Sequence, residues 1–98
     1  MTPAARYASA IAILDIVLAG EPAERALTNW ARSNRFAGSG DRAAIRDHVY
    51  DVLRARRSLA VAGGGEDGRA LIIGLLRRDG TPPDTVFRAG GHAPAALT

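Results

Sequence analysis

Apolar residues recur at helical spacing from the start of the chain. One face of segment 3–19 carries them at intervals of four, three and four residues: Tyr7, Ile11, Leu14 and Leu18. Further apolar residues widen this face: Ala10, Ile13 and Val17. Pro3 suits the first turn of a helix, because its missing N–H would have no partner there, and Gly20 is typical of a helix end. The pattern therefore predicts a mostly buried helix over 3–19.

A second helix is predicted over 21–32, where Pro22 suits the first turn and Glu24 lies near the positive end of the helix dipole. Its inward face comprises Ala23, Ala26, Leu27 and Trp30. Trp30 is the only tryptophan, and its position favours a core anchor between helices over a base-stacking residue.

Ser, Asn and Gly residues in the segment SNRFAGSG (33–40) predict a loop after the second helix. Phe36 is expected to insert from this loop into the core, and Arg35 is expected to stay exposed.

The third predicted helix, 41–57, divides into three stripes when each residue is set 100° from the last. The core stripe comprises Ile45, Val49, Val52 and Leu53. One flank carries Arg42, Arg46 and Arg57, with Tyr50 beside them and Arg54 a little further round. Asp47 and Asp51 lie on the opposite flank, where Asp51 can reach Arg54. The spacing also allows Arg46 to stack on Tyr50.

The pattern of residues 60–98 predicts less regular structure than the preceding segments. The glycine-rich segment 60–68 reads as a turn or loop. Segment 68–80 is apolar all round, which suits a buried helix or a strand equally, and helix is preferred because no other segment predicts a strand to pair with. Gly74 would let a neighbouring helix approach closely. A short helix is predicted over 81–90, capped by Thr81 and ended by Gly90, and the tail 91–98 is irregular.

These elements predict one all-α domain spanning 1–98, because 98 residues are close to the size of a single small domain. The chain has no cysteine, which excludes disulfides, thiolate metal sites and a cysteine nucleophile and fits a reducing, cytoplasmic compartment. No apolar run approaches the roughly 18 residues needed to span a membrane.

The sequence offers no catalytic constellation. His48 and His92 lie far apart, and no group of histidines and acids has the spacing of metal ligands. His48 is expected to be a partly buried core residue and His92 a surface or turn residue. The glycines of AGSGD and AGGGEDG lack the spacing of phosphate-binding loops. Neither a catalytic residue, a metal nor a cofactor is therefore assigned to this chain.

Charge supplies the remaining functional signal. All 13 basic residues are arginine, and segment 25–57 holds eight of them but only three acids. Guanidinium groups match phosphates, and a tyrosine among them can stack on an unpaired base. The candidate RNA-binding residues are Arg35, Arg42, Arg46, Tyr50, Arg54, Arg56 and Arg57. The alternatives are a solvated helical face, ion pairs with acids on other helices, and a protein-binding surface.

Three segments resemble a known family. DRAAIRDHVYDVLRARRSL (41–59) resembles the signature helix of NusB-like domains, and its closest form is the N-terminal domain of the RsmB/Sun ribosomal RNA cytosine-5 methyltransferases. RALIIGLLR (69–77) is similar to that domain's next helix, and HAPAALT (92–98) to the stretch before its last helices.

The resemblance implies a NusB-like helical bundle that binds ribosomal RNA and precedes a catalytic domain dependent on S-adenosylmethionine. It implies that this chain is a truncated, non-catalytic fragment, because the methyltransferase fold and its cysteines are absent. The expected partners are ribosomal RNA and the fragment's own C-terminal catalytic domain, with a dimer through exposed apolar surface as a further expectation. A NusB-like protein-interaction or transcription antitermination module is the alternative, and a stand-alone enzyme is a third hypothesis without an identifiable site.

Overall fold

All regular secondary structure in the computed structural model is helical within the residues that it describes, 1–87 and Pro94. The elements are α1 (Pro3–Leu18), α2 (Ala23–Ser33), α3 (Ser39–Arg54), α4 (Arg56–Gly63), α5 (Gly68–Arg78) and the single 3-10 turn η1 (Pro83–Thr85). The prediction of an all-α fold is confirmed. None of the helices in this part of the chain has the length and apolar character needed to cross a membrane.

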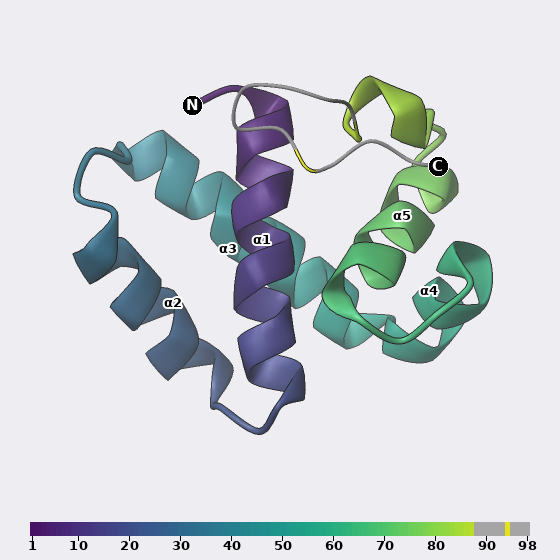
Figure 1. Ribbon diagram of the computed structural model, residues 1–98, viewed down its shortest axis with the longest axis horizontal. Helices are drawn as coiled ribbons and strands as arrows, with labels where there is room; N and C mark the ends of the chain where they lie inside the picture. Colours follow the sequence, from purple (N-terminus) through teal and green to yellow (C-terminus); the bar gives the residue numbers. More distant parts are fainter. Residues whose placement is uncertain (88–93, 95–98) are drawn as a thin grey trace.

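The first helix organises the molecule. Helices α2, α3 and α5 all pack against α1, and α4 packs mainly against α5 (Figure 1). The Thr2 hydroxyl accepts a hydrogen bond from the Ala5 N–H at 3.1 Å and so caps the start of α1. The predicted bounds of this helix are correct to one residue.

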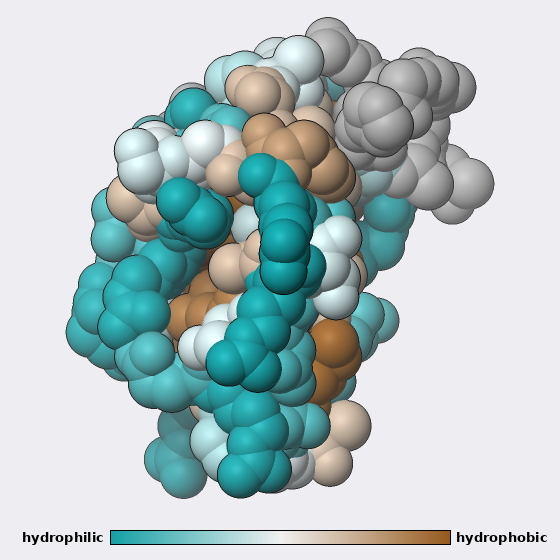
Figure 2. All heavy atoms as spheres, turned by 90° about the vertical axis from the view of Figure 1, so that its left-hand side faces the viewer, coloured by the Kyte–Doolittle hydropathy of each residue, from teal (hydrophilic) through white to brown (hydrophobic). Residues whose placement is uncertain are grey.

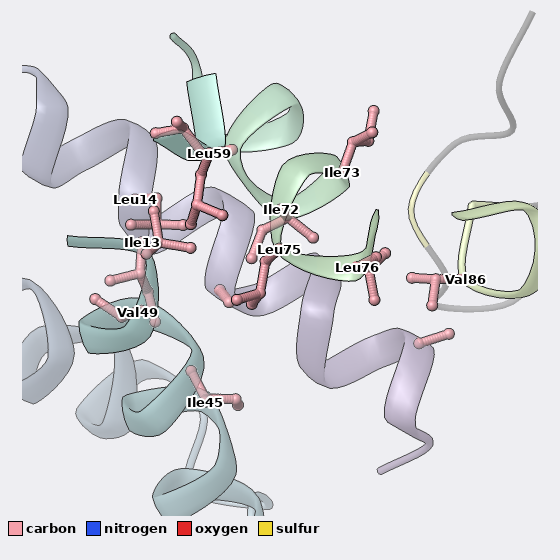
Figure 3. Packing of buried hydrophobic residues seen from close by; sticks show 14 of the residues in the cluster. Ile13, Leu14, Ile45, Val49, Leu59, Ile72, Ile73, Leu75, Leu76 and Val86 are labelled. Atoms are coloured by element: carbon pink, nitrogen blue, oxygen red, sulfur yellow. The ribbon is translucent and has the colours of Figure 1, made fainter. Parts of the chain in front are cut away.

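The core forms where α1, α3 and α5 meet (Figure 3). Its largest fully buried side chains are Ile13, Leu14, Ile45, Val49, Val52, Leu59, Leu71, Ile72, Leu75 and Leu76. The predicted core stripe of the third helix is correct for Ile45, Val49 and Val52, whereas Leu53 is half-buried at the edge of the core.

Asp15 interrupts the apolar run of α1 for a structural reason. Its carboxylate oxygen Oδ1 accepts a hydrogen bond from the backbone N–H of Gly68 at 2.8 Å, across 53 residues of sequence. Gly68 is the first residue of α5, where backbone N–H groups have no partner inside the helix. The one acid in the middle of α1 therefore fixes the start of α5 against it.

The predicted single helix over 41–57 is wrong at its end. The backbone of Ala55 leaves the helical conformation (φ −130°, ψ 28°), and α4 begins at Arg56 in a new direction. The bend turns α4 so that Leu59 is 1% exposed and packs against α5. The glycine-rich turn is correspondingly shorter than predicted, because α4 continues to Gly63 and ends at Gly64 in the left-handed conformation (φ 78°).

Helix α5 confirms the helical interpretation of its apolar run, which is buried on all sides from Leu71 to Leu76. Gly74 does allow the close approach that was predicted: a Cβ atom placed there would overlap the carbonyl oxygen of Leu59. A Cβ atom on Gly63 of α4 would likewise overlap the carbonyl oxygen of Ala70.

Two other local predictions are wrong. Phe36 does not insert into the core; it is 75% exposed, and the neighbouring Ala37 takes the inward position at 3% exposure. Within residues 81–87, the predicted helix over 81–90 is replaced by the 3-10 turn η1, which Pro82 precedes in place of a Thr81 cap. Gly90, His92 and the predicted irregular tail, apart from Pro94, lie outside the described residues.

Candidate nucleic-acid interface

The central arginine of the predicted stripe already has an acidic partner. Both terminal nitrogens of Arg46 on α3 donate to the carboxylate of Glu24 on α2, 22 residues away in sequence. The Tyr50 hydroxyl donates to the same carboxylate at 2.7 Å, and the Arg46 guanidinium carbon lies 5.1 Å from the Tyr50 ring centroid. The predicted stacking is confirmed, and the alternative of an ion pair with an acid on another helix holds for Arg46.

The contacts among Glu24, Arg46 and Tyr50 shift the pKa values of these groups. The hydrogen bond from Arg46, followed by that from Tyr50, lowers the pKa of Glu24 from its ordinary value. The same carboxylate raises the pKa of Tyr50, because the hydrogen bond stabilises the protonated hydroxyl. Glu24 is therefore ionised at neutral pH, and its negative charge offsets the positive charge of Arg46.

The other predicted RNA-binding residues are divided between two ends of the molecule. Arg54 pairs with Asp51 one turn earlier on α3, as the spacing predicts. Arg56 and Arg57 belong to α4 and not to the arginine flank of α3. Twelve residues separate Arg42 from Arg54, which is about 18 Å along the axis of a helix. The seven candidates therefore do not form one continuous stripe.

Three exposed arginines gather where α2 ends and α3 begins, and we call this region the α2–α3 corner: Arg32, Arg35 and Arg42. No carboxylate among the described residues lies within ion-pair distance of any of them. Arg35 and Arg42 were identified from the sequence as candidates. Arg32 was counted only in the local charge excess, although its place just before the Asn–Gly-rich loop was a usable signal.

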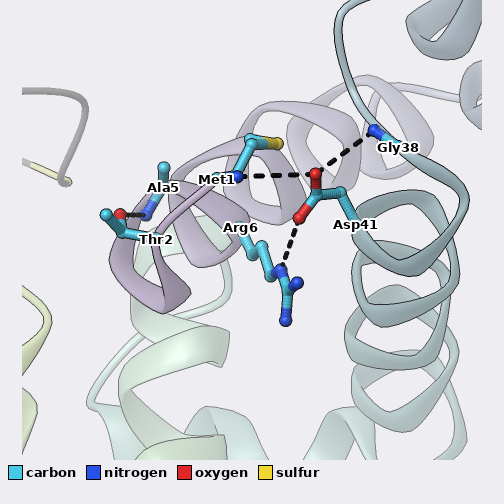
Figure 4. A network of polar contacts seen from close by, with 6 residues as sticks. All are labelled: Met1, Thr2, Ala5, Arg6, Gly38 and Asp41. Atoms are coloured by element: carbon cyan, nitrogen blue, oxygen red, sulfur yellow. Dashed lines mark hydrogen bonds and ion pairs between the residues drawn. The ribbon is translucent and has the colours of Figure 1, made fainter.

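Asp41, the acid next to Arg42 in the sequence, is occupied by other groups. Asp41 accepts from the Arg6 side-chain Nε at 2.9 Å and from the Gly38 N–H at 3.2 Å, and the Met1 amino group lies 3.5 Å away (Figure 4). These contacts, with Arg6 contributing most, lower the pKa of Asp41. Asp41 thus ties α1 to the start of α3, and the positive charge of the α2–α3 corner is not compensated locally.

An open groove of about 250 Å³ lies between α2 and α3 beside the corner. Its lining residues are Leu27, Thr28, Trp30, Ala31, Arg42, Ala43, Ile45 and Arg46. Figure 2, which views this side of the molecule, shows apolar surface between hydrophilic residues. Trp30 packs against the core as predicted, but it is only half-buried and also forms part of the groove wall.

His48 is half-buried on α3, in agreement with the sequence prediction, and stacks on Tyr7 with ring centroids 4.2 Å apart. Burial lowers the pKa of His48 from its model-compound value of 6.5, against the opposing effect of Asp51 and Asp47. Within the described part of the chain, no group of three or more histidine or acidic residues could hold a metal ion.

Because the pKa of His48 is lower in the folded state than in the unfolded state, the unfolded chain binds more protons as the pH falls below about 6.5. The free energy of unfolding should therefore decrease between pH 6.5 and 5, before carboxylate protonation begins. We expect the His48→Gln variant to lose this part of the pH dependence and to keep the decrease below about pH 4.5. Urea unfolding at a series of pH values measures both parts. A variant with the unaltered profile between pH 6.5 and 5 would contradict the assignment to His48.

Comparison with protein-family models, with curated proteins and with solved structures returned no match.

Proposed function

We propose that this domain binds RNA and that the α2–α3 corner holds phosphate groups of that RNA. The observation that carries the proposal is that Arg32, Arg35 and Arg42 are exposed and have no carboxylate partner within residues 1–87. Arginines that are not neutralised within the molecule attract anions, and the guanidinium fork suits phosphate oxygens.

The likeness of segments 41–59 and 69–77 to NusB-like domains supports a narrower proposal. In it, the chain is the non-catalytic RNA-binding domain of an RsmB/Sun-type ribosomal RNA cytosine-5 methyltransferase. The RNA is then ribosomal RNA, and S-adenosylmethionine binds in a separate catalytic domain. Arg35 and Arg42 keep the role predicted for them, whereas Arg46 and Arg54 are engaged in ion pairs and Tyr50 in a hydrogen bond to Glu24.

The test is a titration of labelled single-stranded ribosomal RNA with the purified chain at several salt concentrations. If Arg35 and Arg42 each contact a phosphate, the double variant Arg35→Ala/Arg42→Ala should bind more weakly. The slope of log affinity against log salt concentration should fall in magnitude by about 1.4, because each contact to a single strand contributes about 0.7.

The matched control is Arg25→Ala/Arg78→Ala, which removes the same charge from two exposed arginines that are paired with Glu21 and Asp79. We expect this control to keep the salt slope of the wild type. Undetectable RNA binding at low salt, or equal slopes for the two double variants, would remove the support for the proposal.

A protein partner is the second candidate, and α4 carries the observation that favours it. Val61 is 86% exposed, and the exposed Arg57 lies one turn before it without an ion pair among the described residues. Arginine beside apolar surface is typical of protein interfaces. The partner proposed from the family likeness is the catalytic domain of the same protein. On this proposal, Arg56→Ala/Arg57→Ala leaves the RNA affinity unchanged in the titration above.

A further inference from the structure

The groove between α2 and α3 combines three kinds of surface in one place. Apolar side chains form part of its wall: Leu27, Ala31, Ala43 and Ile45. Trp30 adds an aromatic ring, and Arg42 and Arg46 add guanidinium groups. Its volume of about 250 Å³ is below the range of about 300–1,000 Å³ that drug-sized ligands occupy, so it suits a smaller group.

Trp30 is anchored by packing against the core near the end of α2. Its indole packs against the core, and its backbone carbonyl accepts a hydrogen bond from the Asn34 side chain at 2.8 Å at the end of α2. A ring that packs against the core and is only half-buried loses little conformational entropy when a second ring stacks on it. Base stacking on aromatic side chains is common where proteins bind single strands, and it tolerates any base.

The two arginines that line the groove differ in whether an acidic side chain already pairs with them. Arg46 is paired with Glu24, and Tyr50 donates to the same carboxylate, so the positive charge on this side of the groove is offset within the molecule. Arg42 has no carboxylate partner within residues 1–87, because the adjacent Asp41 bonds to Arg6 and Gly38. The groove therefore offers an apolar, aromatic interior and one free positive charge at its edge.

We propose that this groove receives one unpaired base of the bound RNA, stacked on Trp30, while Arg42 contacts a phosphate next to that base. The inference rests on the proposed RNA binding and adds that the RNA is recognised as a single strand. A duplex keeps its bases stacked inside and can contact only the arginines of the α2–α3 corner. An acidic peptide would use the charge of Arg42 but would stack on the indole only through an aromatic residue, whereas every nucleotide of a single strand carries a flat base.

Trp30 is the only tryptophan, so its fluorescence reports on this groove without any substitution. The experiment titrates the wild-type chain with a short single-stranded RNA of mixed sequence and with the corresponding duplex. Trp30 emission and the anisotropy of a label on the RNA are followed together. We expect the single strand to quench Trp30 with the same apparent Kd that anisotropy gives, and the duplex to bind without quenching.

Substitution gives a second measurement. We expect Trp30→Leu to weaken binding of the single strand about tenfold and to leave binding of the duplex unchanged, because only the stacked base is lost. Trp30→Phe should retain most of the affinity, since it keeps an aromatic ring. Phe36→Leu is the matched control: Phe36 is 75% exposed in the neighbouring loop and does not line the groove. Circular dichroism and thermal melting verify that each variant is folded.

The outcomes separate this inference from the proposed function. RNA binding without quenching of Trp30 overturns the base-binding groove and leaves the proposed RNA binding in place. A loss caused by Phe36→Leu with none from Trp30→Leu also overturns it, because the stacking ring would then lie in the loop. Absence of binding for both single strand and duplex at low salt removes the proposed function and this inference together.

Discussion

The Gly74→Ala variant is expected to lower the free energy of unfolding by about 3 kcal/mol, which corresponds to a fall of roughly 12 °C or more in Tm for a chain of this size. The added Cβ atom would overlap the carbonyl oxygen of Leu59 and lie 2.9 Å from its carbonyl carbon. These are backbone atoms, so no rotation of a side chain relieves the overlap. Helices α4 and α5 would have to move apart, which opens the packing around the buried Leu59.

Gly40→Ala is the matched control for this substitution. Gly40 also lies within a helix, α3, but a Cβ atom there would meet no atom within 4 Å. Alanine has the better helix propensity, so we expect this variant to be unchanged or more stable by about 0.5–1 kcal/mol. Thermal and urea unfolding of both variants provide the measurement. If Gly74→Ala were as stable as Gly40→Ala, the close contact of α4 with α5 would be incorrect.

Ile72→Ala is expected to cost about 2–5 kcal/mol, because it removes a fully buried side chain from the centre of α5. Small domains have a free energy of unfolding of only about 5–15 kcal/mol, so this single substitution would remove a large part of it. Val61→Ala shortens an exposed aliphatic side chain on α4 and should change the stability by less than about 0.5 kcal/mol.

Urea unfolding of the two variants tests whether the apolar run of α5 is buried all round. An exposed strand or a surface helix would leave one face of that run in water. The Ile72→Ala variant would then lose no more stability than Val61→Ala, which is the result that would contradict the described packing.

Local sequence signals were sufficient for most helices. The apolar face of α1, its start near Pro3 and its end before Gly20 are all determined by neighbouring residues, and the prediction matches to one residue. The break at Ala55 had no such signal, because alanine is a strong helix former and no glycine or proline is nearby. The bend follows from the packing of Leu59 and α4 against α5, which depends on residues far apart in sequence.

The exposure of Phe36 and Trp30 also could not be predicted from neighbouring residues in the sequence. Phe36 was expected in the core on hydrophobicity alone, but the short loop directs Ala37 inward and leaves Phe36 in water. Trp30 was expected to be a core anchor, and the divergence of α2 from α3 leaves part of it in a groove. The exposure of Phe36 and of Trp30 cannot be predicted from hydropathy, because it depends on how α2 and the loop after it are placed against α3.

By itself, the amino-acid sequence determined that the chain is helical, that aliphatic residues face inward from α3, and that arginines are concentrated between 25 and 57. Those properties come from spacing and composition. Only the tertiary structure decided which arginines stay available: Glu24 neutralises Arg46 from another helix, Arg6 occupies Asp41, and Arg42 remains without an acidic partner in residues 1–87. The physical reason is that an ion pair requires two side chains within a few ångströms, and folding, rather than sequence order, brings them together.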